Sequence, residues 1–244
     1  MKKLITTIAF IALSTVSAKA IEMEMFSITG GLAANNSVWG ATAQQDEYDD
    51  DNTGTLHASN KESGVFTEGF GSQFVELGIG RWVSLGFEHV PDSISTPQNI
   101  NDAGTRGTTD TNTDATSTVS VDFNDMNTTY LKVNTPMGIY LKYGTVTTDL
   151  DIKETQKSGN TYKNTSVDGT SLGAGYQKTV GESGFGFRIE GNYVELDGVR
   201  VNNGVTKTAG TGLNNFKEIT AKNLEGLTGK VALTYTFGRS GNSF

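Results

Sequence analysis

Long polar insertions alternate with very short turns between stretches of this chain that are apolar at every second residue. Period-two alternation indicates β-strands with one apolar face. When every second connection is long, all the long connections leave from the same end of the strands, and the other end carries only tight turns. This layout favours an all-β, up-and-down barrel whose two ends differ.

The chain contains eight such stretches, each with the same division of faces. At 130–133, for example, Leu131 and Val133 lie on one face and Lys132 lies on the other. Tight turns are expected near 80–81, 134–138 and 181–184, where glycine is always present.

The four long connections are expected at approximately 35–69, 91–120, 149–167 and 197–218. Structureless loops of this length count against a compact soluble domain, but they are typical of the outer loops of a membrane barrel. The strands also have about the ten residues that a tilted strand needs to cross the hydrocarbon layer. The predicted fold is an eight-stranded antiparallel up-and-down transmembrane β-barrel with long extracellular loops.

Residues 1–20 have the pattern of a secretory signal peptide, in which Lys2 and Lys3 precede an apolar run that ends in Ala-Lys-Ala. We expect residues 21–244 to form a single barrel domain after cleavage. No later segment approaches the roughly 18 consecutive apolar residues that a membrane helix needs. Only a closed barrel would then span a bilayer, so the expected location is the outer membrane and the expected surroundings are its lipid.

Composition excludes two classes of protein. The full chain has 27 acidic and 19 basic residues, and this acidic excess argues against a nucleic-acid partner. The chain has no cysteine, so it has no disulfide framework. Stability must therefore come from hydrogen-bonded strands and from burial.

Charged residues recur on the strand face opposite the apolar one. Eight strands leave an interior just wide enough for side chains, and unpaired ions away from bulk water are costly. We therefore expect these charges to pair inside the barrel, as an ionic core that fills it; a gate or polar conduit is the alternative. The seven residues are Glu76, Glu88, Lys132, Lys142, Arg188, Glu190 and Lys230.

Alternation alone does not say which face is buried, because a water-soluble barrel would place the polar face outside. The signal peptide, the one-sided long loops and the aromatic residues near strand ends favour the membrane barrel. These aromatic residues are Trp82, Phe185, Tyr235 and Phe237.

Two stretches carry a resemblance to a known family. FGFRIEGNYVELDG at 185–198 and GKVALTYTFG at 229–238 resemble strands of the small eight-stranded outer-membrane barrels, the opacity-type porins and the transmembrane domain of outer-membrane protein A. The resemblance covers only the strands. It implies a terminal aromatic residue that the barrel-assembly machinery recognises as a partner, and both Phe237 and Phe244 match that role.

The densest charge cluster lies in the first long connection. Asp49, Asp51 and Thr53, followed by Gly54, match the start of a calcium-binding loop, in which ligands alternate before a glycine turn. The twelfth position is Asn60, where a bidentate glutamate is needed. The favoured interpretation is a solvated acidic loop with no cofactor; a weakly bound divalent cation is the alternative.

His57 and Ser59 are of the types that supply a base and a nucleophile, but no third orienting group is evident, and we expect no enzymatic activity. The leading hypothesis is an outer-membrane surface protein whose barrel anchors mobile loops for envelope structure, adhesion or recognition. A passive pore for small solutes is the alternative, and a lipid-modifying enzyme is the third. The sequence identifies no ligand for the loops.

Overall fold

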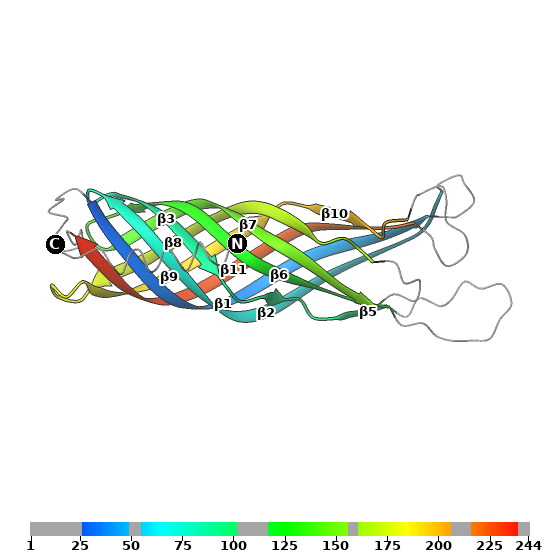
Figure 1. Cartoon of the computed structure of the whole chain (residues 1–244), viewed down its shortest axis with the longest axis horizontal. Coiled ribbons are helices and arrows are strands. Elements are labelled where there is room, and N and C mark those ends of the chain that lie inside the picture. Colours follow the sequence, from blue (N-terminus) through cyan, green and yellow to red (C-terminus); the bar gives the residue numbers. More distant parts are fainter. Residues whose placement is uncertain (1–25, 49–54, 102–116, 156–160, 206–215, 239–244) are drawn as a thin grey trace.

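The computed structural model describes residues 26–48, 55–101, 117–155, 161–205 and 216–238. These residues form one antiparallel sheet that closes on itself as an elongated barrel (Figure 1). The described residues include no apolar helix of the length that crosses a bilayer.

Eight strands form the ring, in the order β1-β2-β3-β6-β7-β8-β9-β11, and the pairing of β11 with β1 closes it. This confirms the predicted architecture. The ring strands are β1 (Phe26–Tyr48), β2 (Leu56–Ile79), β3 (Val83–Val90), β6 (Ser117–Asn134), β7 (Ile139–Thr155), β8 (Thr165–Thr179), β9 (Phe185–Leu196) and β11 (Lys217–Gly238).

Three short strands extend the sheet at one end of the barrel. β4 (Ile94–Ser95) and β5 (Asn99–Asn101) pair with β6. β10 (Val199–Asn202) pairs with β11.

Tight turns join the strands at the opposite end, at 80–82, 135–138 and 181–184, where they were predicted. Gly80, Gly138, Gly181 and Gly184 have φ between +59° and +82° there. Glycine adopts this left-handed conformation without a steric cost. The seam between β1 and β11 begins at this end, with Ser27 opposite Gly238, so the first and last ring strands start and finish beside the turns.

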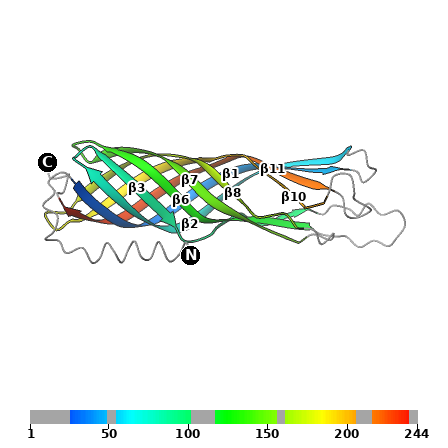
Figure 2. The same ribbon diagram turned by 45° about the horizontal axis from the view of Figure 1, so that its top comes forward.

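The predicted long loops are wrong in extent, because strands continue into them. β1 reaches Tyr48 and β2 begins at Leu56, so most of 35–69 is a hairpin. Strands also occupy parts of 91–120, 149–167 and 197–218. Figures 1 and 2 show these strands running well beyond the part of the barrel near the turns. The pattern of an apolar outward face missed them because that face is polar in their outer portions, as at Thr147 on β7.

The inside and outside of the barrel exchange polarity along its axis, as β7 shows. Near its turn, Ile139 and Leu141 are exposed on the outer face, whereas Lys142 is buried in the lumen. Farther along, Thr147 is exposed outside and Val146 is buried inside. The half near the turns is therefore built for lipid outside and ions inside, and the far half has the reverse arrangement of a water-soluble barrel.

The lumen of the far half is packed with apolar side chains. Trp39 stacks on Phe123 there, with ring centroids 6.0 Å apart and an interplanar angle of 17°. We call this cluster the apolar core; its buried members are Trp39, Val90, Ile94, Phe123, Met126, Val146, Leu150, Val167, Val194, Leu196 and Leu224.

Four large aromatic residues inside the barrel each lie over a glycine of a neighbouring strand. A Cβ added to any of these glycines would collide with the ring. The glycines thus clear the space that lets aromatic side chains lie flat within a narrow lumen. The cross-strand pairs are Phe74 with Gly31, Tyr130 with Gly86, Tyr140 with Gly175, and Trp39 with Gly226.

A charge placed on the lipid-facing surface should damage the barrel far more than the same charge on the outer hairpin. Leu85 on β3 and Leu56 on β2 are 52% and 51% exposed, so they form a matched pair at different heights. We expect Leu85→Arg to cost roughly 2–4 kcal/mol, because its charge lies in hydrocarbon, and Leu56→Arg to cost little. Urea titration of protein refolded into lipid vesicles measures both; equal losses would contradict the assigned lipid-facing band.

Candidate functional site in the barrel lumen

Seven charged side chains fill the lumen of the lipid-facing half, and each is at most 7% exposed. They project inward from six of the ring strands, as the alternation of apolar and polar residues along each strand predicted. We call this set the ionic core; its members are Glu76, Glu88, Lys132, Lys142, Arg188, Glu190 and Lys230.

One half of the ionic core is centred on Glu76. Its carboxylate accepts hydrogen bonds from Lys132, from Arg188 Nη2 at 2.7 Å and from the Tyr130 hydroxyl at 2.8 Å. The Gln177 Oε1 atom accepts from the same two cations, at 3.2 Å from Lys132 Nζ and 2.6 Å from Arg188 Nη2. A neutral amide thus supplies the second acceptor that these two cations need.

The other half is a square of alternating charges. Lys230 Nζ lies 2.5 Å from Glu88 and 3.0 Å from Glu190. Lys142 Nζ lies 2.6 Å from Glu190 and 3.2 Å from Glu88. Each charge contacts two opposite charges from other strands, so the square joins β3, β7, β9 and β11 across the lumen.

Neutral groups satisfy the remaining lone pairs of the square. Ser72 donates to Glu88 at 2.8 Å, and Tyr140 and Asn192 each donate to Glu190 at 2.6 Å. Charge-assisted hydrogen bonds of this kind are about twice as strong as neutral ones.

Aromatic rings contact the cations from a further side. The Arg188 guanidinium lies 4.2 Å from the centre of the Phe74 ring, and Lys142 Nζ lies 4.6 Å from that of Tyr130. Such contacts with a ring face are attractive, more so where water is excluded. The glycines beneath these rings therefore also serve the ionic core.

Charges in the ionic core do not cancel. It contains three carboxylates and four cations. The square is neutral, with two of each sign, so the excess positive charge lies with Glu76, which faces both Lys132 and Arg188.

The other candidate residues lie elsewhere. Asp49, Asp51 and Thr53, the predicted cation ligands, fall outside the described residues, so that site stays a prediction. Ser59 lies on β2 of the outer hairpin, where its hydroxyl donates to Asp46 Oδ1 at 2.6 Å. The side chain of His57 is also outside the described part of the structure.

The sequence reading of the site omitted the neutral residues that complete it. Tyr130, Tyr140 and Gln177 lie on the same lumen-facing side of their strands as the charged residues. The alternation along the strands was therefore the signal that could have identified them. The apolar core was missed altogether, because residues such as Trp39 and Ile94 lie in stretches predicted as loops.

Comparison with known proteins finds only distant similarity. No family model matches the chain, and no curated protein sequence matches it significantly. Among solved structures, it is similar to the outer membrane protein OprG from Pseudomonas aeruginosa, with 12% identity, a TM-score of 0.45, and 84% of this chain and 96% of that chain covered.

Two further solved structures are similar in the same way. For the outer membrane protease OmpT from Escherichia coli the identity is 10%, the TM-score is 0.43, and 91% and 100% of the chains are covered. For Ail of Yersinia pestis, crystallised with a heparin analogue, the corresponding values are 9%, 0.35, 84% and 99%. Since these TM-scores are below 0.5, we derive the fold from the strand pairing and take no activity from these proteins.

Closure and polarity together decide where the molecule resides. A closed ring leaves no unpaired sheet edge in hydrocarbon, and the band of exposed leucine, isoleucine, valine and aromatic side chains around an ionic interior suits only lipid. The protein is an outer-membrane β-barrel. Its tight turns face the periplasm, and its long outer strands face the exterior.

Removing one corner of the square should destabilise the barrel strongly. Glu88→Gln leaves Lys142 and Lys230 with a single carboxylate between them, and breaking a buried ion pair in this way costs about 3–5 kcal/mol. Unfolding in urea from lipid vesicles measures the loss. Glu182→Gln, in an exposed periplasmic turn, is the control; similar stability of the two variants would show that the square does not hold the wall together.

Proposed function

We propose that this protein is a closed outer-membrane anchor that presents extended strands and loops at the cell surface, for envelope structure, adhesion or recognition. The observation that carries the proposal is that two successive layers fill the lumen: the ionic core on the periplasmic side and the apolar core beyond it.

Each layer opposes conduction for a different reason. In the ionic core, opposite charges lie within hydrogen-bonding distance across the lumen, at 2.5–3.2 Å in the square. In the apolar core, an ion would have to leave water for a packed hydrocarbon environment, which is costly. A solute would have to disrupt both layers to cross.

The outer strands form the surface available to partners. Cross-strand side-chain hydrogen bonds support the β1–β2 hairpin, including Thr42 to Ser63 at 2.9 Å and Gln44 to Ser59 at 3.2 Å. A hairpin of this kind holds polar side chains in fixed positions away from the membrane, which favours recognition by an ordered surface.

Phe237 supports the proposed recognition by the assembly machinery. It lies at the end of β11, is 41% exposed, and contacts Tyr235 edge to face with ring centroids 4.5 Å apart. We assign the assembly signal to this residue; Phe244 falls outside the described residues.

A closed barrel should carry no steady current. We expect negligible conductance when the purified protein is reconstituted into planar bilayers at neutral pH, because two filled layers block the lumen. A general porin purified and reconstituted in the same way serves as the positive control. Large, stable single-channel currents from the wild type would instead establish the passive-pore alternative.

Shortening the β1–β2 hairpin should abolish adhesion without affecting the barrel. Gln44 and Lys61 are cross-strand partners, so replacing 45–60 with Asn-Gly gives a two-residue hairpin turn. Cells that display this variant should lose binding to immobilised lipopolysaccharide or matrix glycoproteins while retaining a heat-modifiable barrel on gels. Undiminished binding to every surface that the wild type recognises would exclude this hairpin as the presented element.

A further inference from the structure

A groove lies on the lipid-facing surface of the barrel, across the neighbouring strands β2, β1, β11 and β9. Its volume is about 650 Å³, which is within the roughly 300–1,000 Å³ of clefts that hold small ligands. Outward-facing apolar side chains line it, among them Leu32 and Leu233, which are 63% and 75% exposed. The groove is therefore continuous with the band that meets lipid.

The absence of a side chain at Gly30 contributes to the hollow. Gly30 lies between Val75 on β2 and Tyr235 on β11, and a Cβ built on it would meet no atom within 4 Å. Its backbone is also outside the left-handed conformation that favours glycine. Glycine inside a strand weakens the strand and often marks the close approach of a ligand, and here it leaves open space for one.

Three aromatic rings line the periplasmic side of the groove. Phe185 contacts Tyr235 edge to face with ring centroids 4.8 Å apart, and Tyr235 contacts Phe237 in the same way at 4.5 Å. The Tyr235 ring also lies against the periplasmic turn, because a Cβ on Gly184 would come within 3.3 Å of its Cζ atom. The hydroxyl is bonded to Cζ, so the polar end of Tyr235 lies at the membrane interface, as in an aromatic belt.

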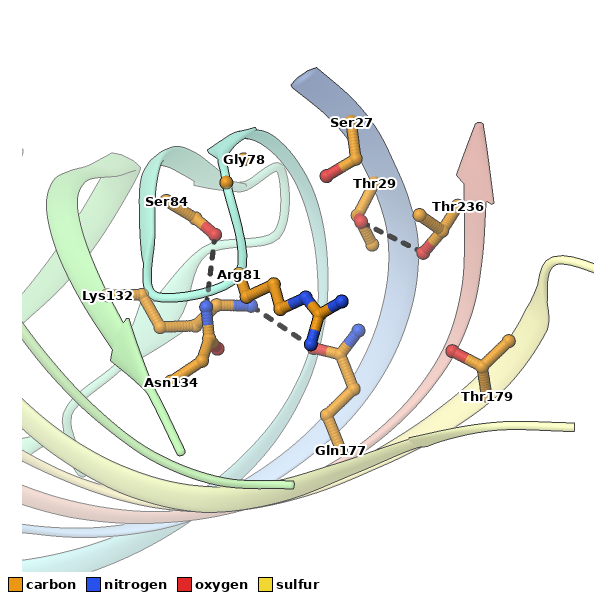
Figure 3. A pocket seen from close by; sticks show the side chains of 11 residues that line it. Ser27, Thr29, Gly78, Arg81, Ser84, Lys132, Asn134, Gln177, Thr179 and Thr236 are labelled. Carbon is orange, nitrogen blue, oxygen red and sulfur yellow. Dashed lines mark hydrogen bonds between the residues drawn. The ribbon is translucent and has the colours of Figure 1, made fainter. Parts of the chain in front are cut away.

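The wall beneath the groove is closed on its lumen side. Thr29 and Thr236, the chain neighbours of Gly30 and Tyr235, share a hydrogen bond of 2.9 Å inside the barrel (Figure 3). The register between β1 and β11 has no shift at this height. A ligand therefore enters the groove from the membrane.

A cation lies beside the groove near the periplasmic turn. Lys178 is exposed on the outer face of β8 and is the cross-strand neighbour of Phe187, which lines the groove. It forms no ion pair with the residues that the structure describes. A lysine at an interface lays its stem along apolar surface and extends its ammonium group to the headgroups. Such a charge attracts anionic lipid.

We propose that this groove binds one acyl chain of an anionic phospholipid of the periplasmic leaflet, and that Lys178 binds the phosphate of its headgroup. The apolar lining matches the hydrocarbon chain, and the ammonium group matches the negative charge. A second copy of the barrel suits the groove less well, because two apolar surfaces gain no hydrophobic stabilisation by meeting inside a bilayer.

Gly30→Leu tests the groove directly. Native mass spectrometry of the full refolded barrel in an uncharged detergent counts retained phosphatidylglycerol. We expect the wild type to retain one molecule in a saturable way and Gly30→Leu to bind at least about tenfold more weakly, because the new side chain fills space that methylene groups would occupy. Gly191→Leu is the matched control: Gly191 is an exposed glycine of β9 with the same open space, outside the groove. All the variants should remain heat-modifiable on gels.

Lys178→Gln tests the headgroup. The wild type should prefer phosphatidylglycerol to phosphatidylcholine of the same chains by about fivefold, the effect of one basic residue near anionic lipid. Lys178→Gln should lose this preference and still retain phosphatidylcholine as the wild type does.

Three results would overturn the proposal. The first is that the folded wild type retains no more lipid than Gly30→Leu, and the second is that Lys178→Gln keeps the full preference for phosphatidylglycerol. The third is a wild-type dimer that Gly30→Leu dissociates, which would show that a second copy fills the groove.

Discussion

Ions enclosed within a barrel cannot be hydrated by bulk water, so each must find its opposite charge inside. The square of Glu88, Glu190, Lys142 and Lys230 meets this requirement with four mutual contacts. Because its members come from four strands, the same contacts hold opposite walls of the barrel together. They do so where lipid surrounds the barrel and the hydrophobic effect does not stabilise it. The glycines that admit inward aromatic rings, and the hydroxyls that complete each carboxylate, depend on this arrangement.

One continuous sheet meets two solvents by changing which face is apolar. Along β9, Arg188 and Glu190 are buried next to the periplasmic turn, whereas Leu196 is buried at the far end beside an exposed Glu195. The hydrophobic effect drives burial only where water is the outer solvent, so apolar packing stabilises the outer portion and ion pairing stabilises the membrane portion. The two mechanisms meet inside single strands, without a domain boundary between them.

Sequence patterning predicts the membrane half well, because lipid imposes strict alternation there. That alternation was enough to place Lys142 and Arg188 in the lumen and a glycine turn at 138. It fails for the outer half, where Trp39 follows the polar run 35–37 and Ile94 lies between serines. The residues that contact Trp39 and Ile94 lie on several different strands, so only the register of strand pairing shows that they form one cluster. The same holds for Gln177, whose role depends on Lys132, 45 positions away, as well as on Arg188 across the β8–β9 hairpin.

The seam that closes the ring joins the first and last ring strands of the chain. Thr29 and Thr236 share a hydrogen bond of 2.9 Å although they lie 207 positions apart in sequence. Contacts between such distant residues form late, because the intervening chain must first be ordered. Until β11 has been delivered, β1 presents a long unpaired edge that other strands can capture. The barrel therefore closes in one final step, after the whole chain has been exported. A chain that lacks β11 cannot form a closed ring.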